Sequence, residues 1–320
     1  MPPSVLTEFL NACRDHDGNE PSKDLRRVTG EFLARAREDA ALVTTATGSL
    51  TSLPPAGAAW LAVVIGAAVE NGTSAELTTS AVVDLLVSWL AKLPVVEPDD
   101  EESMDDWEPT PEQAELLEAF PELGQSVVAH LARMPERRAE LARDEALLDR
   151  LESLEGLSNG IGWVREALIR SSGTLIILYP PSGKGFRLRY QNVGLCFHLF
   201  SLLQAAIGKR IPGGRAPDPA VAAAARGQAS DDVTDEAWWH YGDPGWQTAE
   251  LNGSIWGEAL VSTIPLINGV PVVLLWPAIL ESRSWSTNFG PHLAALPADL
   301  VVEEELSPEA SRAWLQAVGL

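Results

Sequence analysis

The sequence predicts an α+β protein in which a helical N-terminal domain precedes a smaller domain with hairpin-built, mostly antiparallel strands. Every persuasive hydrophobic periodicity up to about residue 170 is helical. Alternating runs and hairpin turn signals begin after Gly173, and the chain of 320 residues is long for one domain. We therefore expect an all-helical domain over residues 1–170 and a Trp-rich α+β domain over residues 171–320.

Amphipathic stripes define the first predicted helices. Hydrophobic side chains recur at helical spacing over residues 5–13 and again over residues 25–36. The proline pair 54–55 favours the start of a third helix, because proline suits the first helical turn. Asn71-Gly72 is a typical helix end and is expected to close it.

A fourth helix is expected to begin with a capping box formed by Thr73 and Glu76 and to stop at Pro94. Further helical stripes continue from residue 111 to about residue 170. Paired helices of this kind build either an irregular helical bundle or a short solenoid. No fixed repeat period separates these two alternatives.

An acidic segment, residues 97–111, is predicted to link these helices. The chain holds 45 acidic and 23 basic residues, a net charge of −22, and residues 97–122 contain twelve acids and no base. Such a charge repels phosphate backbones and anionic lipids, so we expect neither nucleic acid nor a membrane as a partner. A basic protein surface is attracted instead, with Met104 and Trp107 as apolar anchors inside residues 97–108. The alternative is a solvated linker.

Two hairpins mark the second domain. The first hairpin is predicted from two apolar or alternating runs, residues 174–179 and 186–190, with a turn at Pro181–Gly185 between them. This turn does not match the glycine and serine pattern of a phosphate loop, and a strand rather than a helix follows it. Asn268-Gly269 lies between two β-branched runs, and both central positions of a type I′ turn need positive φ. This second hairpin is the stronger prediction of the two.

The remaining segments of the second domain are less regular. Residues 193–207 indicate a buried helix, and residues 208–235 are predicted to be a mobile surface loop with one short helix. Residues 299–304 indicate an edge strand, and Ser307 is expected to cap a final helix.

Cysteine usage and the N-terminus favour a cytoplasmic protein. Cys13 and Cys196 are far apart, and each lies in an apolar helical pattern rather than in a disulfide framework. The first residues lack the basic and apolar regions of a signal peptide. The longest uncharged apolar stretch, residues 56–69, is too short to span a bilayer. Abundant arginine and alanine suggest a bacterial source.

The region 236–292 is the richest in aromatic and polar residues, and seven of the eleven tryptophans follow position 237. Its candidate binding residues are Trp238, Trp239, His240, Asp243, Trp246, Arg283 and Trp285. Aromatic rings beside polar groups suit a pocket for a sugar, a cation or a flat ligand. His240 with Asp243 would supply a base and its orienting carboxylate, and Glu258 with Glu281 an acid pair. The alternative is a tryptophan-heavy core.

These observations predict a non-catalytic intracellular interaction, scaffold or regulatory protein. It would hold a basic or apolar protein partner through residues 97–108 or through the Trp-rich face 236–292. The alternatives are a small-molecule sensor with its pocket in 236–292, or a hydrolase that uses His240 and Asp243. No spacing in the sequence indicates a metal site, a cofactor motif or a catalytic nucleophile, so no cofactor and no catalysis are expected.

Overall fold

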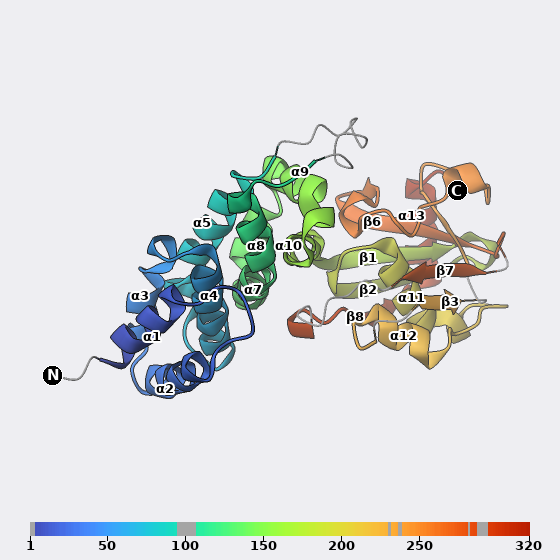
Figure 1. The fold of residues 1–320 in the computed structure, drawn as a ribbon. Helices are drawn as coiled ribbons and strands as arrows, with labels where there is room; N and C mark the ends of the chain where they lie inside the picture. The colour runs from blue at the N-terminus through green and yellow to red at the C-terminus, as the bar shows by residue number, and fades with distance from the viewer. Residues whose placement is uncertain (1–3, 95–106, 230–231, 236–238, 281, 287–293) are drawn as a thin grey trace. The chain divides into compact units, whose positions relative to one another are not determined.

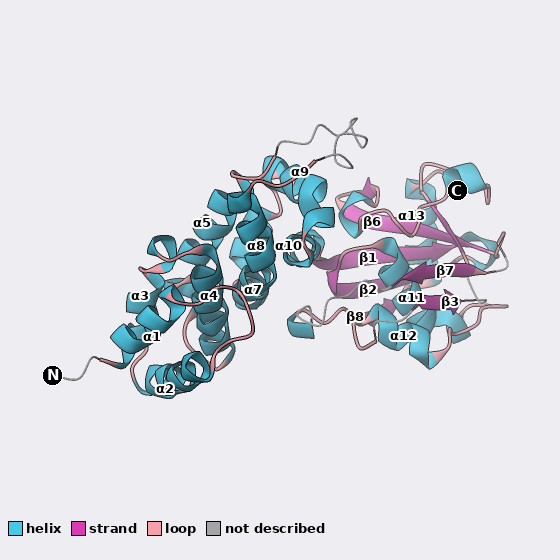
Figure 2. Ribbon diagram, viewed as in Figure 1, coloured by secondary structure: helices cyan, strands magenta, loops and turns pink. Residues whose placement is uncertain are grey.

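The computed structural model describes residues 4–94, 107–229, 232–235, 239–280, 282–286 and 294–320 (Figure 1). The chain divides into two compact units, Met1–Leu168 and Ile169–Leu320. The first is helical, and the second combines helices with a mixed β-sheet (Figure 2). The predicted α+β fold class is therefore confirmed.

The described part of the helical unit consists of α-helices and short 3₁₀ segments. Its helices are α1 (Val5–Arg14), α2 (Lys23–Glu38), α3 (Ala41–Thr47), α4 (Pro55–Glu70), α5 (Thr79–Leu90), α7 (Pro111–Arg133), α8 (Pro135–Leu141), α9 (Glu145–Leu154) and α10 (Asn159–Ile169). Its 3₁₀ segments are η1 (Leu50–Ser52), η2 (Ala75–Leu77) and η3 (Glu155–Leu157). The first three predicted helices thus correspond to α1, α2 and α4.

Helices α4 and α7 form the centre of this unit. Nearly all side chains of α4 are apolar or small, so this helix is buried on most of its faces. Gly66 lets the two helices approach closely, since a Cβ there would lie 3.1 Å from the Ser126 backbone. The Ser126 hydroxyl donates to the Ala62 carbonyl. One turn further along α7, buried His130 contacts Thr78 Oγ1 through Nε2 at 2.9 Å, as a packed core histidine does.

The capping box predicted for Thr73 and Glu76 is not formed, which corrects the expected start of the fourth helix. The segment η2 intervenes, and α5 begins only at Thr79, whose hydroxyl donates to the Ala75 carbonyl at 2.7 Å. Burial of Ala75 and the bond between Thr78 and His130 hold the chain in a 3₁₀ turn here. Tertiary contacts therefore override the local capping signal.

The second unit is built on a sheet with the strand order β4-β6-β1-β2-β8, to which β5 is added beside β6. Its strands are β1 (Ser171–Tyr179), β2 (Lys184–Val193), β4 (His240–Gly242), β5 (Leu266–Ile267), β6 (Val270–Trp276) and β8 (Asp299–Glu305). A separate two-stranded ribbon joins β3 (Asp232–Asp235) to β7 (Arg283–Ser286). The helices are α11 (Cys196–Ile207), α12 (Pro219–Ala225) and α13 (Pro308–Ala317).

Strand pairing is antiparallel except between β1 and β6, which are parallel. The hairpin of β1 and β2 turns at Gly183, with φ of 66°. The hairpin of β5 and β6 turns at Asn268 and Gly269, with φ of 52° and 77°, as a type I′ turn requires. The mostly antiparallel, hairpin-built sheet is as predicted, whereas the parallel pairing was not anticipated.

Helices cover both faces of the sheet. Leu175 and Ile177 of β1 pack in the cluster that contains α11 and α12, whereas Ile176 and Leu178 pack with residues of α13. This alternation follows from the period of two along a strand. The segment 208–235, predicted as a mobile loop with one short helix, contains α12, and α12 buries Val221 and Ala225.

Candidate binding sites

Several predicted site residues lie outside the described part of the chain: Met104, Trp238 and Glu281. Trp107 is described and is half-buried just before α7. Most of the acidic segment 97–108 therefore has no described structure, and its role in binding stays a prediction.

Two of the candidate tryptophans are core residues. Trp239 is buried, and its ring meets Tyr241 edge-on with 6.5 Å between centroids. Trp285 is buried as well, stacked on Phe197 at 5.8 Å and edge-on to His198 at 5.2 Å. Both indole rings therefore pack in the core of the second unit, as the alternative of a tryptophan-heavy core expects, and neither is an exposed ligand-binding surface.

His240 and Asp243 do not form the base–carboxylate pair that their spacing suggested. Asp243 Oδ1 instead accepts the Gly245 backbone N–H at 2.6 Å, which closes a turn. The neighbour of His240 is Ser254, whose Oγ lies 3.3 Å from Nδ1. His240 Nε2 is buried without a hydrogen-bond partner in the described residues.

The chemistry of His240 is set by this environment. Burial lowers the pKa of His240, and the nearby charge of Arg283 lowers it further, so the imidazole is neutral. The tautomer that donates Nδ1–H to Ser254 leaves a lone pair on Nε2, whereas the other tautomer buries an N–H without an acceptor. The first tautomer makes Ser254 an acceptor. This geometry does not favour activation of Ser254 as a nucleophile.

The loop between β4 and β5 carries three exposed apolar side chains. Trp246, Leu251 and Trp256 are 46%, 40% and 45% exposed, and we call this group of side chains the aromatic face. The guanidinium of Arg283 lies over the Trp256 ring, 4.9 Å from its centroid. Burial lowers the pKa of Arg283, and the charge of Glu258 opposes that effect, so Glu258 lies close enough to act on this cation.

Close packing fixes this face on the sheet. An isolated bridge joins Gly242 of β4 to Ser254, and the Ile255 N–H donates to the Tyr241 carbonyl at 2.8 Å. A Cβ at Gly253 would lie 2.5 Å from Trp246 Cβ, so only glycine fits beneath that side chain. The aromatic face is therefore held by backbone hydrogen bonds and by contacts at a glycine.

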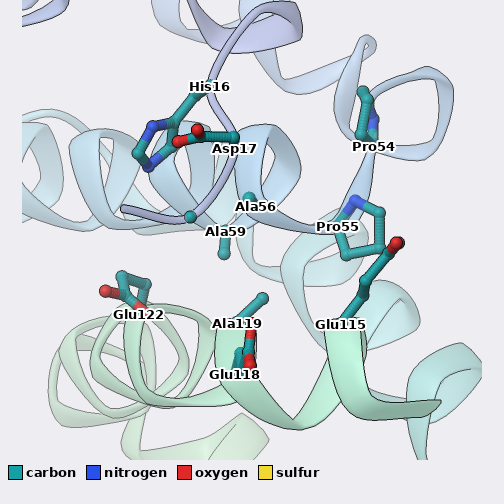
Figure 3. Close-up of a pocket in the computed structure, with 11 residues that line it drawn as sticks. His16, Asp17, Pro54, Pro55, Ala56, Ala59, Glu115, Glu118, Ala119 and Glu122 are labelled. Atoms are coloured by element: carbon teal, nitrogen blue, oxygen red, sulfur yellow. The ribbon is translucent and has the colours of Figure 1, made fainter. Parts of the chain in front are cut away.

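A concave site, the acidic hollow, lies in the helical unit (Figure 3). It has a volume of about 230 Å³ and lies between the turn after α1, the start of α4 and the first half of α7. Its lining combines carboxylates and a histidine with small apolar residues: His16, Asp17, Gly18, Pro54, Pro55, Ala56, Ala59, Glu115, Glu118, Ala119 and Glu122.

The acidic hollow was not predicted from the sequence. Its residues come from three segments that are far apart in the chain, 16–18, 54–59 and 115–122. One local signal was available: Glu115, Glu118 and Glu122 recur at i, i+3 and i+7, which places them on one side of a helix. Within the described ranges, no group of three or more His, Cys, Asp or Glu residues is placed to hold a metal ion.

Comparisons with protein-family models, with curated proteins and with solved structures gave no match. Among the helices that the structure describes, none is long and apolar enough to cross a bilayer. The function of this chain is therefore inferred from the two surfaces described above.

Proposed function

We propose that this chain is a non-catalytic interaction protein whose second unit recognises a protein partner through the aromatic face of Trp246, Leu251 and Trp256. The observation that carries the proposal is the exposure of two large indole rings on one anchored loop. Tryptophan is normally removed from water in a folded protein, and exposed clusters of apolar residues mark interaction sites.

The composition of this face supports the proposal. Tryptophan and arginine are enriched among the residues that dominate binding energy at protein interfaces. Stacking of the Arg283 guanidinium on Trp256 restricts both side chains before binding, so less conformational freedom is lost when a partner docks. The backbone hydrogen bonds that hold Ser254 and Ile255 beside β4 also restrict the loop before binding, which further reduces the conformational freedom lost when a partner docks.

The chemistry of the face indicates the kind of partner. A surface built from indole rings and a leucine is recognised mainly by apolar contact, so the complex should resist salt. Binding through the acidic segment 97–108, which remains an untested alternative, should instead weaken as salt screens the charges. The salt dependence of one complex therefore distinguishes the two modes.

The test is a pull-down of the tagged full chain from host lysate at low and at about 1 M salt. We expect one stoichiometric partner that persists at high salt and is lost from the W246A/W256A variant. The matched control is L266A/V301A, which removes two other exposed apolar side chains, on β5 and β8, that are 62% and 45% exposed. Circular dichroism should show that both variants remain folded.

A partner retained by folded W246A/W256A would refute the role of this face. If the partner were lost equally from L266A/V301A, the partner would bind exposed apolar side chains in general and not this face in particular. A complex that dissociates at high salt would indicate binding through an acidic surface instead of the aromatic face.

A further inference from the structure

A second hollow adjoins the acidic hollow in the helical unit. It has a volume of about 330 Å³ and shares the lining residues Pro55 and Glu115 with the first, so the two hollows are neighbours along α7. We call it the leucine hollow, because its floor includes Leu50, Leu53, Leu85, Trp89 and Leu116. Its rim is polar and includes Thr51, Ser88, Lys92 and Glu112. Together the two hollows form the α7 groove.

The lining of the acidic hollow contains one histidine, His16, and no lysine or arginine. Glu115, Glu118 and Glu122 form no salt bridge with any described residue. Figure 3 shows them on α7, with His16 and Asp17 on the opposite side of the hollow. Acids of α2, by contrast, are paired, as Arg27 is with Asp24 and Glu31.

The negative charge of the groove is concentrated at one end. At the leucine hollow, Lys92 pairs with Glu112 at 3.0 Å and neutralises that carboxylate, which leaves Glu115 as the other acid of its lining. The acidic hollow has four carboxylates and no Lys or Arg in its lining. The groove therefore has a strongly acidic half and a less acidic half with an apolar floor.

The spacing of the carboxylates favours an extended ligand over a single ion. Glu115 and Glu122 are seven residues apart on α7, which separates their Cα atoms by about 10 Å along the axis. The described residues supply no cluster that could converge on a metal. Basic side chains carried by a chain segment match such a row of separate charges.

We propose that the α7 groove binds a basic amphipathic segment of a partner protein. Its Lys or Arg side chains face Glu115, Glu118 and Glu122, and its apolar side chains lie over the floor of the leucine hollow. Charge complementarity identifies the occupant, because a row of unpaired carboxylates repels an acidic segment. This surface is separate from the aromatic face, and the proposal does not depend on that face.

The same row of like charges opposes folding when no ligand is bound. Glutamates three or four positions apart on a helix repel one another, and Lys92, the described base that is paired with α7 at this groove, bonds to Glu112 rather than to Glu115, Glu118 or Glu122. Neutralising two of them should therefore stabilise the free protein slightly while weakening its binding. A variant that binds more weakly but is at least as stable as wild type has lost a binding group, whereas a variant that has lost its fold is less stable.

The experiment titrates the full chain with a synthetic helical peptide in which lysines and leucines occupy opposite faces, using calorimetry at low salt. The variant E118Q/E122Q should bind about tenfold more weakly, as expected for the loss of two charge pairs. The control E76Q/E145Q changes the same net charge at exposed glutamates outside the groove and should bind like wild type. A second peptide, with the leucines replaced by serine, should bind much more weakly than the first.

Three results would overturn the proposal: no binding of the lysine–leucine peptide, equal weakening in E76Q/E145Q, or equal affinity for the serine peptide. The second would show attraction to overall charge, and the third would show that the leucine hollow makes no contact. None of these outcomes bears on the aromatic face, which is tested by W246A/W256A.

Discussion

Replacing Gly124 by alanine should destabilise the helical unit, because two helix backbones touch at this position. A Cβ on Gly124 would lie 2.5 Å from the carbonyl oxygen of Gly160 and 2.7 Å from its Cα, both in α10. These are backbone atoms, so no side-chain rotation can relieve the contact. Reaching the 3.4 Å of ordinary contact requires the two backbones to separate by about 0.9 Å (3.4 − 2.5).

The expected magnitude combines two opposing effects. Overpacking of this kind costs about 1–3 kcal/mol, whereas alanine gains about 1 kcal/mol of helix propensity over glycine. Because the clash is with backbone atoms, we take the upper end of the steric cost and expect a net loss of about 2 kcal/mol (3 − 1) for G124A. Gly30 in α2 is the matched control, since its Cβ would meet nothing within 4 Å. There the same substitution should stabilise the unit by about 1 kcal/mol.

The assay follows unfolding of the helical unit inside the full chain. Cys13 is fully buried in this unit and Cys196 in the other, so urea-dependent thiol labelling, resolved by peptide mass spectrometry, reports each unit separately. The Cys13 transition should move to lower urea in G124A and to higher urea in G30A, and the Cys196 transition should stay in place. If G124A proved as stable as wild type at Cys13, the close approach of α7 and α10 would be disproved.

Three further outcomes follow from local geometry and burial. G269A should lower the stability of the second unit by about 1–2 kcal/mol, measured as the Cys196 transition, because φ at this position is 77°; an unchanged midpoint would contradict the type I′ turn. Burial raises the pKa of both the Cys13 and the Cys196 thiol to about 12, so a thiol reagent at pH 8 should label the native protein negligibly and the urea-unfolded protein fully. Burial, aided by the charge of Arg170, lowers the pKa of His198 to about 3, and burial lowers the pKa of His130 and His240. Imidazoles in the unfolded chain have a pKa of about 6.5, so below that pH the unfolded chain binds more protons than the native protein. The urea midpoint of unfolding should therefore fall as the pH is lowered from about 6.5 toward 3.

Local signals in the sequence predicted the elements that depend on local physics. The proline pair 54–55 starts α4, and Asn268-Gly269 turns a hairpin, because a fixed φ or a tolerated positive φ acts within a few residues. Thr73 carried a local capping signal that failed, since burial of Ala75 and the bond of Thr78 to His130 fix the chain there. A local rule is therefore reliable only where no long-range contact competes with it.

The candidate sites were harder to predict, because they are assembled from distant segments. His240 and Asp243 are close in sequence, but His240 meets Ser254, which the bridge to β4 brings beside it. The α7 groove needs the packing of α4 against α7 before Pro55 and Glu115 become neighbours. Periodicity along α7 shows which glutamates share a side of the helix, but not which residues lie opposite them.

The parallel pairing of β1 with β6 sets the order in which the second unit can be completed. Ile176 pairs with Val272, 96 positions later (272 − 176), so this contact closes a long loop and should form slowly. During synthesis the apolar strand 174–179 can pair with β2 early, but its other edge stays open until β6 leaves the ribosome. Such an open apolar edge is prone to pair with another chain. Chains truncated before Val270 should therefore aggregate, and chaperones are expected to act on this unit at that stage of translation.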